Sequence, residues 1–218
     1  MNRNIAADRI KEIGIFPGLR FSLADDAMYC AETLYNSGIP VAEITMTVPH
    51  AIDVIRQLAL KFPDMVVGAG TVLDSDTALR CLDAGAQFIT STGFVPDVVA
   101  ATLNANIVSI PGALTPSEVI ACWKSGVDFV KIFPAAALGG DLYIRSLKLP
   151  LPQVQIIAAG GVTQQTAAGY VRAGAAALGL GSELLPKDAV TKRQEHRIRE
   201  LARRFLGFVS EGRSSAST

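Results

Sequence analysis

The chain has 218 residues, of which half are hydrophobic, and its 20 basic residues balance 20 acidic ones. This length and composition suit one α/β domain with a large core. A net charge near zero argues against nucleic acid or an anionic membrane surface as a partner. The N-terminus mixes charged and single apolar residues, which predicts neither a secretory signal nor a membrane span. Cys30, Cys81 and Cys122 lie far apart, without metal-ligand spacing, so we expect buried thiols in a cytoplasmic protein.

Eight short apolar runs alternate along the chain with segments of helical pattern. Their starts recur every 19 to 27 residues, from 88 to 107 at the shortest and from 14 to 41 at the longest, which is the span of one strand, one helix and two loops. Near-continuous apolar strands are typical of a parallel sheet that is buried on both faces. The runs are 14–20, 41–46, 65–71, 88–91, 107–112, 129–134, 155–161 and 177–182.

Helix ends are marked between these runs. Gly38 and Gly85 close two helical segments at positions typical of a C-terminal glycine cap. Thr115 is a predicted N-cap, because Pro116 follows it at a position typical of the first helical turn. Residues 3–13 form a further amphipathic pattern ahead of the first strand, which predicts an extra helix over the N-terminal mouth of a barrel.

Eight β/α units in one chain predict an α/β fold, a (β/α)8 TIM barrel with an extra N-terminal helix. An open, doubly wound sheet is the alternative. We expect residues 1–210 to form a single domain and residues 211–218, which are small and polar, to form a disordered tail. The basic last helix is interpreted as a solvated outer face rather than a nucleic-acid site.

Polar residues gather at the C-terminal ends of the predicted strands, where barrels of this class carry their active sites. Glu43, Thr45 and Thr47 share one parity of their strand and are expected to face the barrel interior. Lys131 and Phe133 share one parity of another strand. The sequence therefore predicts that a glutamate and a lysine meet inside the barrel.

A lysine and a glutamate buried together can be a self-satisfied salt bridge, which contributes little to stability because desolvation offsets the attraction. They can also be catalytic. A desolvated lysine amine attacks a carbonyl to form a Schiff base, and a nearby carboxylate moves the protons. We favour the catalytic interpretation for Lys131 and Glu43.

Glycine-rich ends of the last two runs suggest a site for phosphate or another anionic group. Glycines let backbone N–H groups approach an anion, and barrels often bind phosphate at this corner. Gly160 and Gly161 end one run, and Gly181 and Ser182 end the next. Glycines also serve tight turns, so this signal alone is weak.

Seven motifs in order resemble the bacterial class I aldolases for 2-keto-3-deoxy-6-phosphogluconate (KDPG) and 4-hydroxy-2-oxoglutarate (KHG). The resemblance covers about residues 10 to 205, and the "GAGT", "SIPG" and "KIFP" stretches together are specific. It implies a barrel in a homotrimer, no metal, no cofactor, and pyruvate as the keto product. The motifs are "VAEITM", "VGAGTVLD", "GAQFITSTGF", "SIPGALTPSE", "FVKIFPA", "AAGGV" and "LGLGSELL".

The resemblance also implies roles for single residues. Lys131 matches the Schiff-base lysine and Glu43 the general acid and base of the family. The positions that match substrate-binding residues are Arg20 in the phosphate region, Thr71 near the pyruvyl group, Phe133 packing on the substrate, and Gly160, Gly161, Gly181 and Ser182 in the phosphate corner.

Three positions depart from the family pattern. Thr47 stands where the family has the arginine that grips the substrate carboxylate. Thr92 stands where the family has the proline of "SPG", and Ala159 where it has the threonine of "TGG". Loss of a bidentate arginine weakens carboxylate binding, so the altered positions predict an intact Schiff-base machinery with changed substrate recognition.

The leading hypothesis is therefore a metal-independent carbon–carbon lyase acting on a small 2-keto-4-hydroxy acid, phosphorylated or not. The substrate can be that of either enzyme in the family or a different one. Two alternatives remain open: a phosphate-binding isomerase or epimerase without a covalent intermediate, and a binding barrel without turnover. His50 and His196 are interpreted as surface residues and favour none of these.

Overall fold

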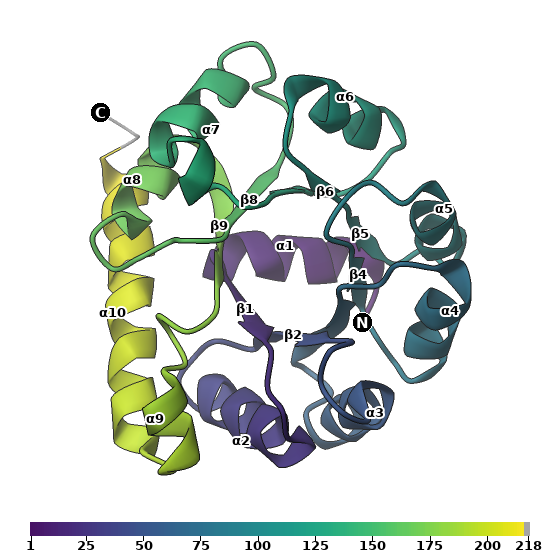
Figure 1. Ribbon diagram of the computed structural model, residues 1–218, viewed down its shortest axis with the longest axis vertical. Coiled ribbons are helices and arrows are strands. Elements are labelled where there is room, and N and C mark those ends of the chain that lie inside the picture. Colours follow the sequence, from purple (N-terminus) through teal and green to yellow (C-terminus); the bar gives the residue numbers. More distant parts are fainter. Residues whose placement is uncertain (216–218) are drawn as a thin grey trace.

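A computed structural model describes residues 1–215 of the chain. Nine strands form a nearly closed, barrel-like sheet, with the helices arranged around its outside (Figure 1). Every strand pair in this part of the chain is parallel. The strands are β1 (Ile15–Leu19), β2 (Val41–Thr45), β3 (Val66–Gly70), β4 (Phe88–Thr90), β5 (Val108–Ile110), β6 (Gly112–Ala113), β7 (Val130–Ile132), β8 (Ile156–Ala159) and β9 (Ala175–Leu180).

The order of the strands brings the first and the last one side by side. Strand β1 pairs with β2 on one side and with β9 on the other. The complete order is β5-β4-β3-β2-β1-β9-β8-β7-β6, so the two outermost strands follow each other directly in the chain. An open, doubly wound sheet would separate these strands, and the alternative fold is therefore wrong.

The sequence predicted one strand over 107–112. This prediction is wrong in one respect, because the structure has two strands there, β5 and β6, separated at Pro111. Proline has no N–H to donate to a strand ladder and interrupts regular pairing. Its carbonyl still accepts a hydrogen bond of 2.9 Å from the backbone N–H of Lys131. Strand β5 thus pairs with β4, and β6 pairs with β7.

The outer helices cover the sheet with apolar faces. On β2, Ala42 and Ile44 belong to the core between sheet and helices, whereas Glu43 faces the interior of the barrel, as the alternation predicted. The helices are α1 (Arg3–Ile13), α2 (Ala24–Tyr35), α3 (Ala51–Lys61), α4 (Ser75–Asp83), α5 (Pro96–Asn104), α6 (Pro116–Lys124), α7 (Asp141–Lys148), α8 (Ala167–Arg172), α9 (Lys187–Thr191), α10 (Glu195–Ser214) and the 3-10 helix η1 (Ala136–Leu138).

The predicted cap residues lie at helix ends. Thr115 is the N-cap of α6 and forms a capping box with Glu118, in which each side chain accepts from a backbone N–H of the other's position. Gly38 and Gly85 follow α2 and α4 with φ angles of 83° and 98°. These left-handed conformations cost glycine little, since it lacks a Cβ.

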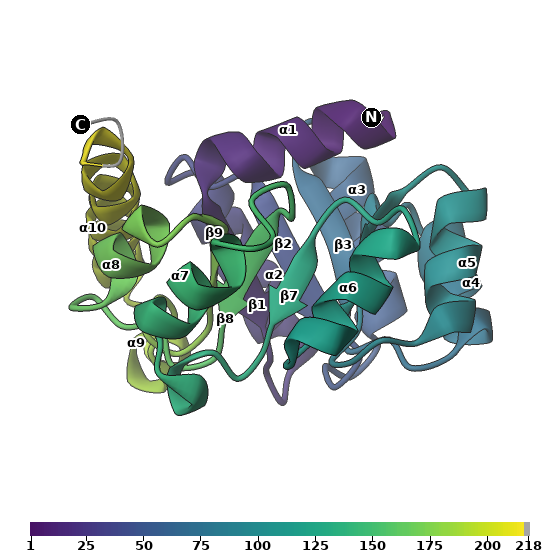
Figure 2. The same ribbon diagram turned by 90° about the horizontal axis from the view of Figure 1, so that it is seen from above.

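Helix α1 lies across one end of the barrel (Figure 2). Its buried residues Ala6, Ala7 and Ile10 pack against side chains near the beginnings of the strands, among them Phe16 and Phe88. This helix therefore covers the N-terminal end of the barrel, and the opposite end, where the strands finish, remains accessible.

The prediction of a disordered tail is wrong for residues 211–214, which continue helix α10 to Ser214. Gly212 is buried, and a Cβ at this position would lie 2.6 Å from the Cβ of Val171 on α8. Arg213 donates a hydrogen bond of 2.7 Å to the carbonyl of Glu12. Packing and hydrogen bonding hold this turn, and residues 216–218 of the predicted tail lie outside the described part.

Candidate active site

A pocket of about 340 Å³ opens at the carboxyl ends of the strands, opposite α1. Eight of the eleven predicted site residues line it, drawn from five parts of the chain that lie far apart in sequence. They are Arg20, Glu43, Lys131, Phe133, Gly160, Gly161, Gly181 and Ser182. The sheet order explains the meeting, because β2, β1, β9, β8 and β7 are consecutive neighbours.

Lys131 and Glu43 are in direct contact at the floor of this pocket. The Nζ of Lys131 lies 3.0 Å from Oε1 of Glu43, and their side chains are only 14% and 4% exposed. Lys131 sits at the middle of β7 and Glu43 at the middle of β2. An ammonium and a carboxylate that are removed from water are costly to bury unless they are paired, and here each is the other's partner.

The carboxylate of Glu43 is held on several sides. The hydroxyl of Thr90, which is fully buried at the end of β4, donates to the same Oε1 that contacts Lys131. Gly70 and Gly18 border the carboxylate, and a Cβ at Gly18 would lie 2.9 Å from Oε2. These neighbours surround the carboxylate closely, and its Oε1 contacts the lysine amine.

The glycines at the ends of the last two strands line one corner of the pocket. Gly160 has a φ angle of 85°, and a Cβ there would lie 2.9 Å from the Cα of Pro134 and 3.0 Å from the ring of Phe133. Gly161 has a φ angle of 82°. Ser182 and Gly181 line the same pocket from the end of β9. Phe133 is 40% exposed, so its ring is available to a bound molecule.

Arg20 extends across the mouth of the pocket from the end of β1. Its Nη2 donates a hydrogen bond of 3.2 Å to the hydroxyl of Thr71, which immediately follows β3. Thr71 adopts a left-handed φ angle of 59°, which is uncommon for a β-branched residue. Thr71 does not itself line the pocket. It is connected to the pocket by its hydrogen bond from Arg20.

Thr47 and Thr92 are not brought into this pocket. Strand β2 ends at Thr45, and the chain turns before Thr47, which is exposed and shares a hydrogen bond of 2.8 Å with the Thr45 hydroxyl. Thr92 is exposed, and its carbonyl packs against Gly112 on β6. Alternation along β2 predicted that Thr47 faces the barrel interior. This prediction is wrong because the strand ends at Thr45, two residues earlier.

Several pocket residues were not singled out from the sequence as site residues. Thr45 lines the pocket, whereas Thr90 does not line it but donates to the Glu43 carboxylate; both lie at strand ends, and their polarity within apolar runs was an available signal. Glu183 and Thr163 line the pocket from loops and carried no such signal. Gly18 appears as an ordinary turn glycine in sequence, although it borders the Glu43 carboxylate.

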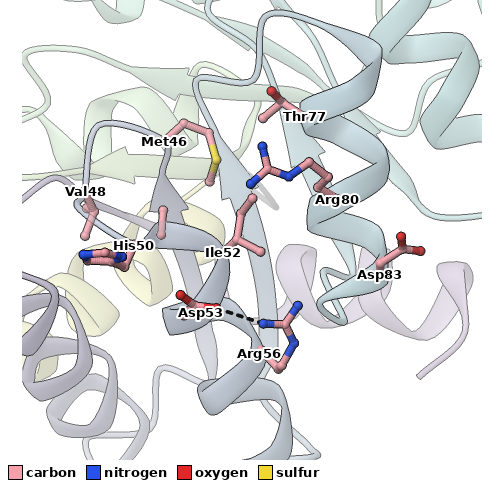
Figure 3. Close-up of a pocket in the computed structure, with 10 residues that line it drawn as sticks. Met46, Val48, His50, Ile52, Asp53, Arg56, Thr77, Arg80 and Asp83 are labelled. Atoms are coloured by element: carbon pink, nitrogen blue, oxygen red, sulfur yellow. Dashed lines mark hydrogen bonds and ion pairs between the residues drawn. The ribbon is translucent and has the colours of Figure 1, made fainter.

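Other features of the described chain lie away from this pocket. A hollow of about 580 Å³ on the outside of the barrel, between α3 and α4, is lined by Met46, Asp53, Arg56 and Arg80 among others, and Asp53 and Arg56 pair within it (Figure 3). Residues 1–215 contain neither a group of three or more potential metal-ligating side chains nor a helix long and apolar enough to span a membrane.

The histidines and cysteines have the exposure that the sequence predicted. His50 and His196 are exposed, and the three cysteines are buried and unpaired.

A buried lysine touching a carboxylate, at the carboxyl ends of a parallel barrel and beside a glycine-rich corner, provides the groups that carbonyl chemistry uses.

Comparison with known proteins places this arrangement in a family. The family model for KDPG and KHG aldolase matches residues 6–201. The KHG/KDPG aldolase of Escherichia coli is 32% identical over 203 residues, which cover 93% of this chain and 95% of that protein. The 2-dehydro-3-deoxy-phosphogluconate aldolase of Haemophilus influenzae is 30% identical over 202 residues, with 93% and 95% covered.

A solved structure agrees with this assignment. The crystal structure of KDPG aldolase from Legionella pneumophila, with pyruvate captured as a covalent carbinolamine intermediate, superposes with a TM-score of 0.83 at 30% identity. The superposition covers 90% of this chain and 96% of that one. The chain belongs to the KDPG and KHG aldolase family and is a lyase of the aldolase type.

Proposed function

We propose that the protein is a class I aldolase that cleaves a 2-keto-4-hydroxy acid into pyruvate and an aldehyde. The single observation that supports this most strongly is the contact of 3.0 Å between Lys131 Nζ and Glu43 Oε1 inside the pocket. The substrates named for the relatives, KDPG and KHG, are the first candidates for this chain.

The proposed reaction begins when the neutral amine of Lys131 adds to the C2 carbonyl of the keto acid. Loss of water from the carbinolamine leaves an iminium, which accepts the electron pair of the C3–C4 bond when that bond breaks. Glu43, through a water molecule, takes the proton of the C4 hydroxyl, and the aldehyde departs. Protonation of the enamine at C3 and hydrolysis release pyruvate and the free lysine.

The surroundings of Glu43 support its role in proton transfer. Thr90 and Lys131 both donate to Oε1, which leaves Oε2 as the oxygen beside Gly18 and available to a water or a substrate hydroxyl. A general base must lie within hydrogen-bond reach of its proton or one water away from it. We assign Glu43 both proton steps on this basis.

The other predicted residues are proposed to bind the substrate. Phe133 packs against the carbon chain, and the backbone N–H groups near Gly160, Gly161 and Gly181 with the Ser182 hydroxyl receive an anionic end. Arg20, whose guanidinium donates to the Thr71 hydroxyl, binds the same anionic end from the phosphate region. Thr92 supports the neighbouring loop from outside the pocket.

Several broader properties are part of the same proposal. We count β5 and β6 as one interrupted strand of a (β/α)8 barrel, and residues 1–210 as one domain. We propose a homotrimer that needs no metal or cofactor and works in the cytoplasm. Mass measurement by light scattering tests the trimer, and activity after exhaustive chelation tests the metal independence.

The proposed function is tested by borohydride reduction in the presence of pyruvate, followed by intact mass measurement of the wild type and of Lys131→Ala. We expect a pyruvyl adduct on the wild type and none on the variant. Ligand binding and turnover without any adduct would instead support an isomerase, and binding without turnover would support a non-catalytic barrel.

A further inference from the structure

Thr90 is a fully buried polar residue that faces the barrel interior without lining the active-site pocket. It is the last residue of β4, whose other two residues, Phe88 and Ile89, are apolar and buried. Its hydroxyl donates to Oε1 of Glu43 and forms no other hydrogen bond within residues 1–215. Burial of a hydroxyl is costly unless it is paired, so the contact with Glu43 is what compensates for the burial of Thr90.

The strand between these two residues allows them to meet. Strand β3 lies between β2 and β4, and its Gly70 borders the Glu43 carboxyl group. A Cβ at Gly70 would lie 2.5 Å from Cγ and 2.6 Å from Cδ of Glu43. Gly68 of the same strand is covered in the same way by the ring of Phe88, which comes from β4. Because both positions lack a side chain, residues of β2 and β4 occupy the space over β3.

The two donors to Oε1 of Glu43 differ in what the proposed reaction does to them. The Nζ of Lys131, 3.0 Å from Oε1, has three N–H bonds as an ammonium. In the proposed reaction this nitrogen becomes a neutral amine and then an iminium, which retains a single N–H. The Thr90 hydroxyl takes part in none of these steps. Thr90 is therefore the donor to Oε1 that stays the same throughout the reaction.

The two oxygens of the Glu43 carboxylate are not equivalent as proton acceptors. A proton on Oε1 would point at the Thr90 oxygen, and the Thr90 hydroxyl proton would then lose its only acceptor within residues 1–215. An unpaired buried donor is unfavourable. Oε2 accepts no hydrogen bond from this part of the chain, and it borders Gly18, which lines the pocket. The arrangement favours Oε2 as the oxygen that takes up and returns protons.

We propose that Thr90 is a positioning residue for proton transfer, which holds Oε1 of Glu43 and so directs proton exchange to Oε2 while Lys131 changes its bonding. This inference rests on the proposed aldolase function. Thr90 is not a catalytic residue in this scheme, because it contacts Glu43 and does not line the substrate pocket.

The test compares the wild type with Thr90→Val, which keeps the shape of the side chain and removes the hydroxyl. The rate of exchange of the pyruvate methyl protons in D2O is measured against pyruvate concentration. We expect the maximal rate to fall about 10- to 100-fold, the factor that one hydrogen bond to a charged group is worth. The half-saturating pyruvate concentration, and the fraction of protein that borohydride traps at saturation, should stay within about twofold.

Two further comparisons distinguish positioning from a general effect on the fold. Thr102→Val makes the same chemical change at another fully buried hydroxyl, which donates a hydrogen bond of 2.7 Å to the carbonyl of Val98 in α5, and should exchange protons at the wild-type rate. Thr90→Val added to Glu43→Gln should cause no further loss, because a residue that acts through Glu43 has nothing left to position.

A second pair of variants keeps the test valid if Thr90→Val does not fold. Thr90→Ser and Thr90→Ala both lack the methyl group and differ only in the hydroxyl. We expect the serine variant to recover most of the exchange rate and the alanine variant to remain slow. Circular dichroism checks the fold of each variant.

The outcomes separate this inference from the function on which it rests. If the wild type forms no pyruvyl adduct and exchanges no pyruvate protons, the aldolase function fails and the inference fails with it. If the wild type is active, the inference alone is overturned by any of three results: exchange in Thr90→Val as fast as in Thr102→Val, equal rates for the serine and alanine variants, or an equal effect of Thr90→Val with and without Glu43→Gln.

Discussion

The Nζ of Lys131 and Oε1 of Glu43 lie 3.0 Å apart although 88 residues separate them along the chain. The barrel brings the two residues together, because β7 and β2 each direct one of them inward at the same level. The pair has the form of a buried salt bridge, which alone contributes little to stability. Both residues line an open pocket, which is the position that the proposed Schiff-base chemistry requires.

Glu43→Gln keeps the size of the side chain and removes its ability to accept a proton. We expect proton transfer at C3, and with it aldol cleavage, to slow by about 10²- to 10⁴-fold, the usual contribution of a general acid–base group. The measurement is the exchange of the pyruvate methyl protons in D2O, followed by NMR, which reports enamine formation and protonation without an aldehyde.

The matched control is Glu200→Gln on the outer helix α10, where Glu200 pairs with Arg204 far from the pocket. It makes the same chemical change and should exchange pyruvate protons at the wild-type rate. Equal rates for Glu43→Gln and the wild type would show that another group moves the protons.

Gly70→Ala tests the positioning of Glu43 without touching its carboxylate. The new methyl group would collide with the Glu43 carboxyl group, whereas at Gly18 the nearest carboxyl oxygen would be 2.9 Å away. We expect proton exchange to fall more in Gly70→Ala than in Gly18→Ala. Circular dichroism checks that both variants fold, and the reverse order of the two rates would contradict this account of the site.

Much of the architecture was predictable because it follows from short-range patterns. Apolar runs at the β/α period predicted the strands, and alternation within β2 and β7 predicted that Glu43 and Lys131 meet. The break at Pro111 had a visible signal in the proline itself. Thr47 was misplaced because parity does not reveal where a strand ends.

Other parts of the site depend on tertiary contacts that one sequence does not display. Thr90 is a functional neighbour of Glu43 only because β4 lies two strands from β2 in the sheet.

The three cysteines are predicted to be unreactive in the folded protein. Burial raises the pKa of the thiol from its ordinary value of 9.0 to about 12 for Cys30 and Cys122 and to about 11 for Cys81. A thiol reagent such as DTNB, applied at pH 8, should label none of them before unfolding and all three in denaturant. Rapid labelling of the native protein would contradict this burial.

The same shifts have a consequence for stability at high pH. Because the folded pKa values lie above the unfolded ones, unfolding releases thiol protons once the pH passes the ordinary value of 9.0. The contribution of these thiols to stability is therefore complete below that pH and declines above it. Urea unfolding between pH 8 and 10, compared with a Cys30→Ala variant, measures the decline.

Thr115→Ala removes the side-chain half of the capping box at the start of α6. Loss of an N-cap oxygen typically costs about 1 kcal/mol of the free energy of unfolding. Urea denaturation should show this loss as a lower midpoint with an unchanged slope. An unchanged midpoint would mean that Glu118 and the tertiary contacts of α6 hold the helix start without Thr115.

Peptide mapping after borohydride treatment, which locates the reduced pyruvyl group, directly tests whether Lys131 forms the Schiff base. We expect the pyruvyl group on the peptide that contains Lys131. We expect none on Lys131→Arg, which keeps the positive charge but does not form the Schiff base. Modification of another lysine in the wild type, or an unmodified Lys131 at saturating pyruvate, would contradict the assignment of the nucleophile.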